Sequence, residues 1–340
     1  MTGGSGPPTL EQVAALAGVS RATVSRVVNG SPKVSPAVRA QVERAVAKLG
    51  YVPNRAARSL VTRRADSVAL VVSEPHARFF SEPFFAGMVR GVSAALAETG
   101  VQLLLLIAQD LPDRGWLGRY VVGGHVDGVL LASLHADDPL PGTLERAGVP
   151  AVLIGRPVDQ TVPGSYVDAD NRGGAGKAVG HLARRGRRRI ATITGSLDMG
   201  VGQDRLQGYR DGLATAGRAG AGDLVETGDF TEEGGAAAMG RLLERPGDPV
   251  DAVFAASDLM AAGALRALRA AGRRVPEDVA VVGFEDSAVA RYAQPPLTTV
   301  RQPIEEMGRQ ATRLLLAQVA GEAGGMHLVL DTELVVRASA

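Results

Sequence analysis

The residue types that carry metal, redox or nucleophilic chemistry are absent or scattered in this chain of 340 residues. The chain has no cysteine, which excludes disulfides, iron–sulfur clusters, thiolate zinc sites and a cysteine nucleophile. Its five histidines include no pair at metal-ligand spacing, no GxSxG string occurs, and RGGAGKAVG (172–180) lacks the spacing of a phosphate loop. We therefore expect no metal, no cofactor and no catalytic constellation.

Basic side chains, in contrast, are concentrated at one end of the sequence. Residues 1–64 carry ten basic and two acidic side chains, a net charge of +8, which leaves 27 basic and 34 acidic side chains on the remainder. A small basic segment on a mildly acidic body is typical of a nucleic-acid-binding protein. Charge alone leaves a merely solvated basic face as the alternative.

Three short helices are predicted to position these basic residues. Thr9 and Gln12 form a capping-box pattern that opens a helix over LEQVAALA (10–17), and Gly18 suits its left-handed end. Ser20 can cap a second helix, RATVSRVVN (21–29), which turns Val24 and Val27 inward and its arginines outward. Two helices joined by a tight turn that contains glycine predict a helix-turn-helix, whose second helix fits the DNA major groove.

A third helix is predicted to close the core of this basic head. Pro36 stands at a favoured first helical position after Ser35, and Gly50 ends the helix after Leu49. Its apolar positions follow helical spacing: Val38, Val42, Ala45, Val46 and Leu49.

The first sixty residues closely resemble the DNA-binding headpiece of the LacI/GalR (lactose-repressor) family. The resemblance covers some fifty contiguous residues, including AGVS, TVSRVVN and YVPN. It implies that Arg21, Ala22 and Arg26 read base edges, with arginine bidentate to guanine and Ala22 against a thymine methyl. It further implies that polar residues position phosphates, and these are Thr9, Ser20, Thr23, Ser25 and Asn29.

By the same resemblance, PNRAARSL (53–60) corresponds to a hinge helix. Asn54 would cap it, and Ala56 and Ala57 are small enough to enter a minor groove or to pack against a symmetry mate. Arg58 would also contact DNA, and Leu60 would wedge between central base pairs and kink the duplex. Eight residues make only a marginal helix in isolation, so a plain linker is the alternative interpretation. The same marginality would let DNA and a partner subunit switch the segment between folded and unfolded.

From residue 67 the pattern changes to short apolar strands that alternate with amphipathic helices. Predicted strands are 68–73, 102–107, 128–132, 151–155, 189–195, 252–256 and 279–284. This order predicts an α/β body with parallel sheets, and its length favours two lobes with a ligand in the cleft between them. The family resemblance continues through QDRLQGYRDGL and VPEDVAVVGFEDSAVARYAQPPLTTVRQP. It implies an all-α helix-turn-helix headpiece on a two-lobed α/β core like the periplasmic binding proteins. The first lobe would take residues 67–168 and about 300–325, and the second lobe would take residues 169–298 and the C-terminal strands.

Seven residues are candidates for effector contacts by this resemblance: Phe84, Phe85, Arg156, Arg205, Phe230, Ser257 and Glu285. Core packing is the alternative for the three phenylalanines, and a surface salt bridge is the alternative for Arg205. Asp258 is expected to cap a helix. Glu285 departs from the family, which usually has aspartate first in the string that reads GFED here, so the carboxylate reaches one methylene further. A sugar or sugar derivative is the effector we expect.

The sequence thus predicts a transcriptional repressor, and not an enzyme, whose operator affinity is controlled by a small molecule. A periplasmic solute-binding protein and an enzyme on the α/β body are the alternatives. The predicted parts are a flexible leader (1–8), a helix-turn-helix domain (9–53), a hinge helix and linker (54–66) and a two-lobed domain (67–340). The leader does not read as a signal peptide, so a cytoplasmic protein is expected. No leucine heptad trails the last strand-like segment, so a homodimer on a roughly palindromic operator is expected.

Overall fold

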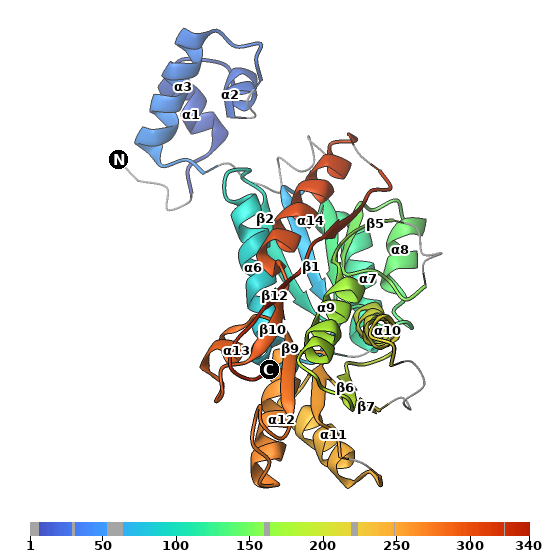
Figure 1. Ribbon diagram of the computed structural model, residues 1–340. Coiled ribbons are helices and arrows are strands. Elements are labelled where there is room, and N and C mark those ends of the chain that lie inside the picture. Colours follow the sequence, from blue (N-terminus) through green and yellow to red (C-terminus); the bar gives the residue numbers. More distant parts are fainter. Residues whose placement is uncertain are drawn as a thin grey trace. The chain divides into compact units, whose positions relative to one another are not determined.

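The computed structural model describes residues 7–28, 31–52, 64–109, 111–159, 164–218, 224–247, 249–322 and 324–340. The chain divides into two compact units between Asp66 and Ser67 (Figure 1). We call the first unit the head and the second unit the body. None of the helices in these described ranges is long and apolar enough to span a membrane.

The head consists of α1 (Leu10–Ala17), α2 (Arg21–Val28) and α3 (Pro36–Leu49). The predicted capping box is present, because Thr9 Oγ1 accepts from the Gln12 backbone N–H and Gln12 Oε1 accepts from the Thr9 N–H. Gly18 and Gly50 end α1 and α3 in the left-handed conformation, with φ of 60° and 62°. A residue with a side chain would be strained there, which explains glycine at both positions.

A small apolar core holds the three head helices together. Its fully buried members are Val13, Ala14, Ala17, Val24, Val27, Val42, Ala45 and Tyr51. The predicted core positions on α3 are all part of it, with Val42 and Ala45 buried and Val38, Val46 and Leu49 packed at its margin. Since α2 buries Val24 and Val27, its arginines are left on the outer face.

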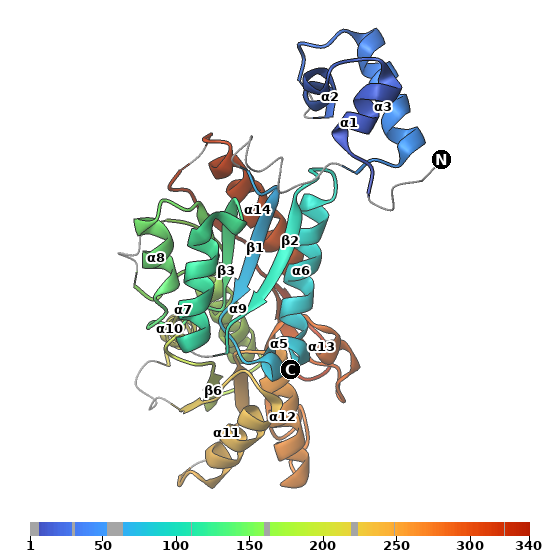
Figure 2. The same cartoon turned by 180° about the vertical axis from the view of Figure 1, so that it is seen from behind.

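The first lobe of the body is a parallel sheet between two helical layers. Its strands, in spatial order, are β11 (His327–Leu330), β5 (Ser165–Ala169), β4 (Ala151–Ile154), β3 (Gly128–Ala132), β1 (Ser67–Val72) and β2 (Gln102–Ile107). One face packs on α6 (Pro83–Leu96) and α14 (Ile304–Val319). The short helix α5 (His76–Ser81) precedes α6 in the chain. The other face packs on α7 (Leu111–Tyr120), η1 (Val121–His125) and α8 (Leu140–Arg146) (Figure 2).

The second lobe repeats this arrangement. Its strand order is β12 (Glu333–Val335), β10 (Thr298–Arg301), β9 (Ala280–Glu285), β8 (Ala252–Ala255), β6 (Ile190–Thr194) and β7 (Val225–Thr227). All pairs are parallel except β10 with β12, which are antiparallel. Helices α9 (Asn171–Arg184) and α10 (Gly200–Thr215) cover one face. Helices α11 (Glu232–Glu244) and α12 (Asp258–Ala270) cover the other, and α13 (Ala288–Tyr292) follows β9.

The chain passes between the lobes three times, and these passages decide where a ligand can sit. The crossover segments lie between β5 and α9, at Asp170; between β10 and α14, at residues 302–303; and between β11 and β12, at residues 331–332. The expectation that both C-terminal strands belong to the second lobe was wrong. β11 pairs with β5 in the first lobe, and its Leu328 and Leu330 pack against the apolar core of that lobe.

Candidate functional sites

The outer face of α2 presents the three side chains predicted to read bases. Arg21, Ala22 and Arg26 are exposed, while Val24 and Val27 on the opposite side are buried. Arg21 Nε lies 2.9 Å from Glu11 Oε1, and both side chains are more than 60% exposed. Such an exposed pair is worth at most about 1 kcal/mol, so Arg21 can exchange Glu11 for another acceptor at low cost.

Three of the polar residues expected to contact phosphates, Thr9, Ser20 and Thr23, lie at helix starts. Ser20 Oγ accepts from the Thr23 N–H at 3.2 Å and lies 2.9 Å from Thr23 Oγ1, so it caps α2 as predicted. Thr9 caps α1, and Ser25 is half-buried. Five further predicted contacts lie outside the described residues: Asn29, Asn54, Ala57, Arg58 and Leu60.

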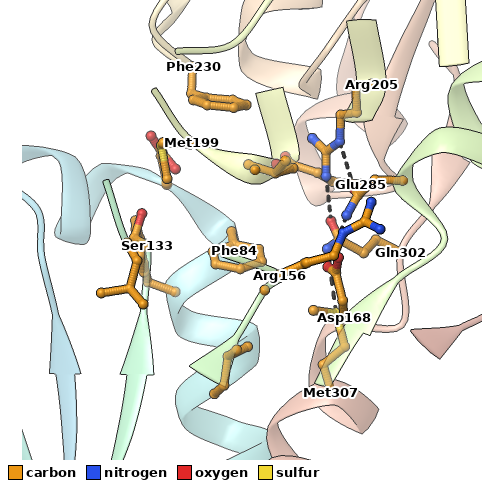
Figure 3. A pocket seen from close by; sticks show the side chains of 18 of the residues that line it. Phe84, Ser133, Arg156, Asp168, Met199, Arg205, Phe230, Glu285, Gln302 and Met307 are labelled. Carbon is orange, nitrogen blue, oxygen red and sulfur yellow. Dashed lines mark hydrogen bonds between the residues drawn. The ribbon is translucent and has the colours of Figure 1, made fainter. Parts of the chain in front are cut away.

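In the body, a cavity lies between the two lobes at the carboxyl ends of their strands, where α/β sheets bind ligands (Figure 3). It encloses about 660 Å³ of space, a volume that includes solvent at its open mouth. The structure brings six of the seven candidate effector residues to its wall: Phe84, Phe85, Arg156, Arg205, Phe230 and Glu285. Ser257 is not among them. It is buried, and its hydroxyl caps α12 by accepting from the Met260 N–H, whereas Asp258 bonds Thr299 and Ser287.

Arg205 is the most enclosed cation of this cavity, at 2% exposure, so it does not form the surface salt bridge considered above. Its guanidinium donates from Nε to Asn171 Oδ1 (2.9 Å), from Nη1 to the Ala256 carbonyl (2.5 Å) and from Nη2 to Gln302 Oε1 (3.1 Å). It also stacks on Phe284, 3.7 Å from the ring centroid. Burial lowers its pKa to about 10, so it is still charged at neutral pH.

Three of the five guanidinium N–H groups of Arg205 thus have protein acceptors in the described part of the chain. Two remain, on a side chain that lines the cavity. Because the guanidinium is planar and held on three sides, these two donors have a fixed direction.

Asp168 and Asn171 form a hydrogen-bonded polar pair, and Asn171 links this pair to Arg205. Asp168 Oδ1 accepts from the Ala169 N–H (2.9 Å) and from Asn171 Nδ2 (3.0 Å), and its side chain is only 4% exposed. Burial raises the pKa of Asp168 to about 6, although the charges of Arg156 and Arg205 act in the opposite direction. This carboxyl can therefore serve as donor or acceptor near neutral pH.

Glu285 ends β9 with a left-handed backbone, at φ of 116°. A non-glycine residue is strained in this region, and such strain is concentrated at functional sites. Burial, followed by the charge of Asp258, raises the pKa of Glu285 well above its ordinary value. The one residue that departs from the family pattern is thus held in an unusual conformation on the cavity wall.

Aromatic and ionic contacts join the lobes around the cavity. Phe230, from the second lobe, lies over Gly195 so closely that a Cβ there would meet the ring at 1.9 Å. The guanidinium of Arg78, from α5 of the first lobe, lies 5.0 Å from the centre of the same ring. Arg156 of the first lobe is paired with Asp204 of the second. Phe85 is packed in the first-lobe core and Phe84 is half-buried beside it.

Several cavity residues were missed by the sequence reasoning: Arg78, Glu82, Asp168, Asn171, Met199 and Gln302. A usable signal existed for three of them. Asp168 and Asn171 lie at the end of a strand in YVDADN, and Gln302 directly follows the strand TTVR. Polar residues at the ends of parallel strands converge on one edge of a sheet, so these three could have been found. The remainder lie on helices and loops that approach the cavity only in the folded body.

Both parts of the chain match known protein families. The model for bacterial regulatory proteins of the lacI family matches residues 9–54, and the model for a periplasmic-binding-protein-like domain matches residues 179–340. The HTH-type transcriptional regulator CelR of Thermobifida fusca is 59% identical over 336 residues, which are 98% of each chain. The HTH-type transcriptional repressor CytR of Escherichia coli K12 is 33% identical over 97% of this chain and 96% of its own.

The chain belongs to the lacI family of bacterial transcriptional regulators. The solved complex of CelR with cellobiose superposes with a TM-score of 0.79 at 56% identity, covering 98% of this chain and 100% of that one. The Lac repressor dimer bound to operator and an anti-inducer gives 0.84 at 28% identity, covering 98% and 99%. The predicted fold and the predicted function are confirmed: the protein is a DNA-binding regulator, not an enzyme, and a small-molecule effector controls its operator affinity.

Proposed function

We propose that the cavity between the lobes binds a neutral disaccharide, cellobiose or a close relative, as the effector. The observation that carries this proposal is that carboxyl groups match the cations in number on the cavity wall. Three cations line it, Arg78, Arg156 and Arg205, and three carboxyl groups, Glu82, Asp168 and Glu285. An anionic ligand such as a sugar phosphate or sugar acid would need an excess of cations.

The cations of the wall are also already engaged, which strengthens the argument. Arg78 donates to Glu74 (2.7 Å) and Glu82 (2.5 Å), and Arg156 is paired with Asp204. The groups left for a ligand are two N–H groups of Arg205 and carboxyl groups with raised pKa. These groups suit the hydroxyls of a sugar, which both donate and accept, and aromatic side chains such as Phe84 supply an apolar surface for the faces of the ring. The complex of the relative CelR with cellobiose supports a β-linked glucose pair as the first ligand to test.

Isothermal titration calorimetry of the full-length protein tests the effector class. Cellobiose is expected to bind, while cellobionate, which carries a carboxylate, is expected to bind at least tenfold more weakly. Arg205→Met should abolish binding, whereas Arg266→Met, which removes an exposed arginine paired with Glu232, should not. Binding of cytidine in place of cellobiose, or tighter binding of cellobionate, would refute the proposal.

For the head, we propose that Arg21, Ala22 and Arg26 read bases in the major groove. Gel shifts with selected operator sequences should show a loss of about 1–3 kcal/mol for Arg21→Ala or Arg26→Ala, with relaxed preference at one base pair. Lys48→Ala, in the last turn of α3, is the control for loss of a positive charge. An equal loss in all three variants would assign the arginines to phosphates only.

The proposal for residues 54–60 is that Leu60 inserts into the minor groove and Asn54, Ala57 and Arg58 line the DNA. Leu60→Ala should then lower both operator affinity and the bend angle of the DNA. Unchanged affinity and bend would contradict this role. Thr9, Ser20, Thr23, Ser25 and Asn29 are proposed to position the head on phosphates.

A homodimer in the cytoplasm completes the proposal, with the predicted limits of leader (1–8), head (9–53), hinge and linker (54–66) and body (67–340). The edge strand β2 supports pairing through the first lobe, because its apolar side chains are partly exposed, Leu105 at 39%. Leu105→Arg should raise the monomer fraction in sedimentation. Val329→Arg, on the opposite edge strand β11 and 53% exposed, is the matched control.

A further inference from the structure

The side chain of Arg205 is bonded to Gln302, which lies in one crossover segment between the lobes (Figure 3), and to Asn171, which directly follows another. Its Nε donates to Asn171, the first residue of α9, directly after the crossover at Asp170. Its Nη2 donates to Gln302, which is itself the crossover between β10 and α14. All three side chains are buried, with exposures of 2%, 2% and 6% for Arg205, Asn171 and Gln302.

Asn171 and Gln302 continue the connection into the first lobe. Asn171 Nδ2 donates to Asp168 Oδ1 (3.0 Å) and to the Ala169 carbonyl (3.2 Å), both at the end of β5. Gln302 Nε2 lies 3.5 Å from the sulfur of Met307 on α14. At the other end, Nη1 of Arg205 is fixed to the Ala256 carbonyl in the second lobe. A continuous chain of hydrogen bonds therefore runs from one lobe to the other through the cavity cation.

We infer that Asn171 and Gln302 are positioning residues that couple effector binding to the angle between the lobes. A ligand that engages the two remaining N–H groups of Arg205 acts on a rigid planar group whose other donors are held by the crossovers. Rotation of the guanidinium must lengthen or shorten the bonds to Asn171 and Gln302. A change in lobe angle acts on the same network, through the crossover at Gln302 and through the bonds of Asn171 to the end of β5. The free energy of effector binding therefore depends on the angle between the lobes, and this dependence is the allosteric coupling.

This inference rests on the proposed function only for the choice of probe ligand, cellobiose. The measured quantity is the coupling ratio, the operator Kd at saturating cellobiose divided by the operator Kd without it. Gln302→Met keeps the side-chain length and loses the acceptor, and it is expected to bring this ratio at least fivefold closer to one. Because Gln302 lines the cavity, each operator Kd is measured at a cellobiose concentration that saturates the variant in question, so that weaker binding of cellobiose does not by itself change the ratio. Gln302→Glu retains an acceptor oxygen and should restore the coupling.

Thr192→Val is the matched control for a merely structural effect. Thr192 is 1% exposed and donates to the Phe254 carbonyl within the second lobe, away from the crossovers. Its removal should lower the melting temperature without changing the coupling ratio. If Gln302→Met and Asn171→Ala show the same coupling ratio as Thr192→Val, the inference is wrong.

A ligand-free measurement separates failure of the inference from failure of the proposed effector. If cellobiose does not bind the unaltered protein, the effector proposal is wrong and the coupling proposal is decided by hydrogen exchange. Peptides that span the crossovers at 165–172 and 300–306 should exchange at least threefold faster in Asn171→Ala and Gln302→Met than in Thr192→Val. Equal exchange in the three variants would show that these side chains do not hold the crossovers.

Discussion

Replacement of Asp168 by asparagine should stabilise the body at neutral and alkaline pH, because the native structure opposes ionisation of this carboxyl group. Its pKa is raised from 3.8 to about 6, first of all by burial. The folded protein then binds a proton more tightly than the unfolded chain. The free energy of unfolding therefore falls as pH rises from about 4 through about 6, and it is lowest above that range.

The size of the effect follows from the shift of the pKa. A shift of roughly two units corresponds to about 3 kcal/mol, of which about half develops between pH 5 and pH 8. No discount for solvent screening is needed, because the side chain is 4% exposed. Asparagine retains an oxygen for the bonds from the Ala169 N–H and Asn171 Nδ2, so the geometry of the site can be kept.

Urea denaturation followed by circular dichroism at pH 5, 6, 7 and 8 measures the difference between Asp168→Asn and the unaltered protein. That difference should grow by about 1.5 kcal/mol in favour of the variant between pH 5 and pH 8. Asp278→Asn is the control, since an arginine partner lowers the pKa of Asp278 to about 2 and its contribution is constant over this range. A difference for Asp168→Asn that does not vary with pH would refute the reasoning.

Three further predictions concern the head, the cleft and the helix packing. Thr9→Ala removes the capping box of α1 and should lower the stability of the head by about 1 kcal/mol, measured by thermal unfolding of the full chain. His135 Nδ1 in the first lobe lies 2.6 Å from Asp198 Oδ2 in the second, and hydrogen bonds with Glu74 and then Asp198 raise the pKa of His135 above 6.5. The stability that this contact gives is complete below pH 6.5 and is lost as pH rises through the higher folded pKa, and His135→Gln should remove that dependence in pH-resolved urea titrations. Gly208→Ala would place a Cβ 2.1 Å from the Arg172 carbonyl and should cost about 1–3 kcal/mol in urea denaturation, whereas Gly240→Ala, in open space, should cost nothing.

Much of the fold could be predicted because its signals are local. The seven predicted strands were observed with ends within one residue of the prediction, since each is a short run of mostly apolar residues bounded by polar residues or glycine. The strands β5, β7 and β10 were not predicted. Two of them contain a carboxylate or an arginine, SYVDA and TTVR, and the third has only three residues, so that apolar periodicity is too weak to reveal them.

The candidate site was only partly predictable, because some of its residues belong to recognisable strings and others reach the cavity only in the folded body. The resemblance of QDRLQGY and GFED to family strings brought Arg205 and Glu285 to attention, but it also proposed Ser257, which caps α12 instead. No sequence pattern pointed to Arg78 and Glu82, because they reach the cavity from α5 of the first lobe and from the residue that ends it.

By itself, the sequence determined the three head helices and their exposed arginines, the alternation of strands and helices, and the absence of cysteine and of metal-ligand spacing. These properties depend on caps, turns and periodicity, which act over a few residues. Only the tertiary structure decided that Asn171, Arg205 and Gln302 form one buried network, that β11 joins the first lobe, and that cations and carboxyl groups balance on the cavity wall. The reason is that the chain passes between the lobes three times, so that groups more than 90 residues apart become neighbours, and no local pattern records which of them will meet.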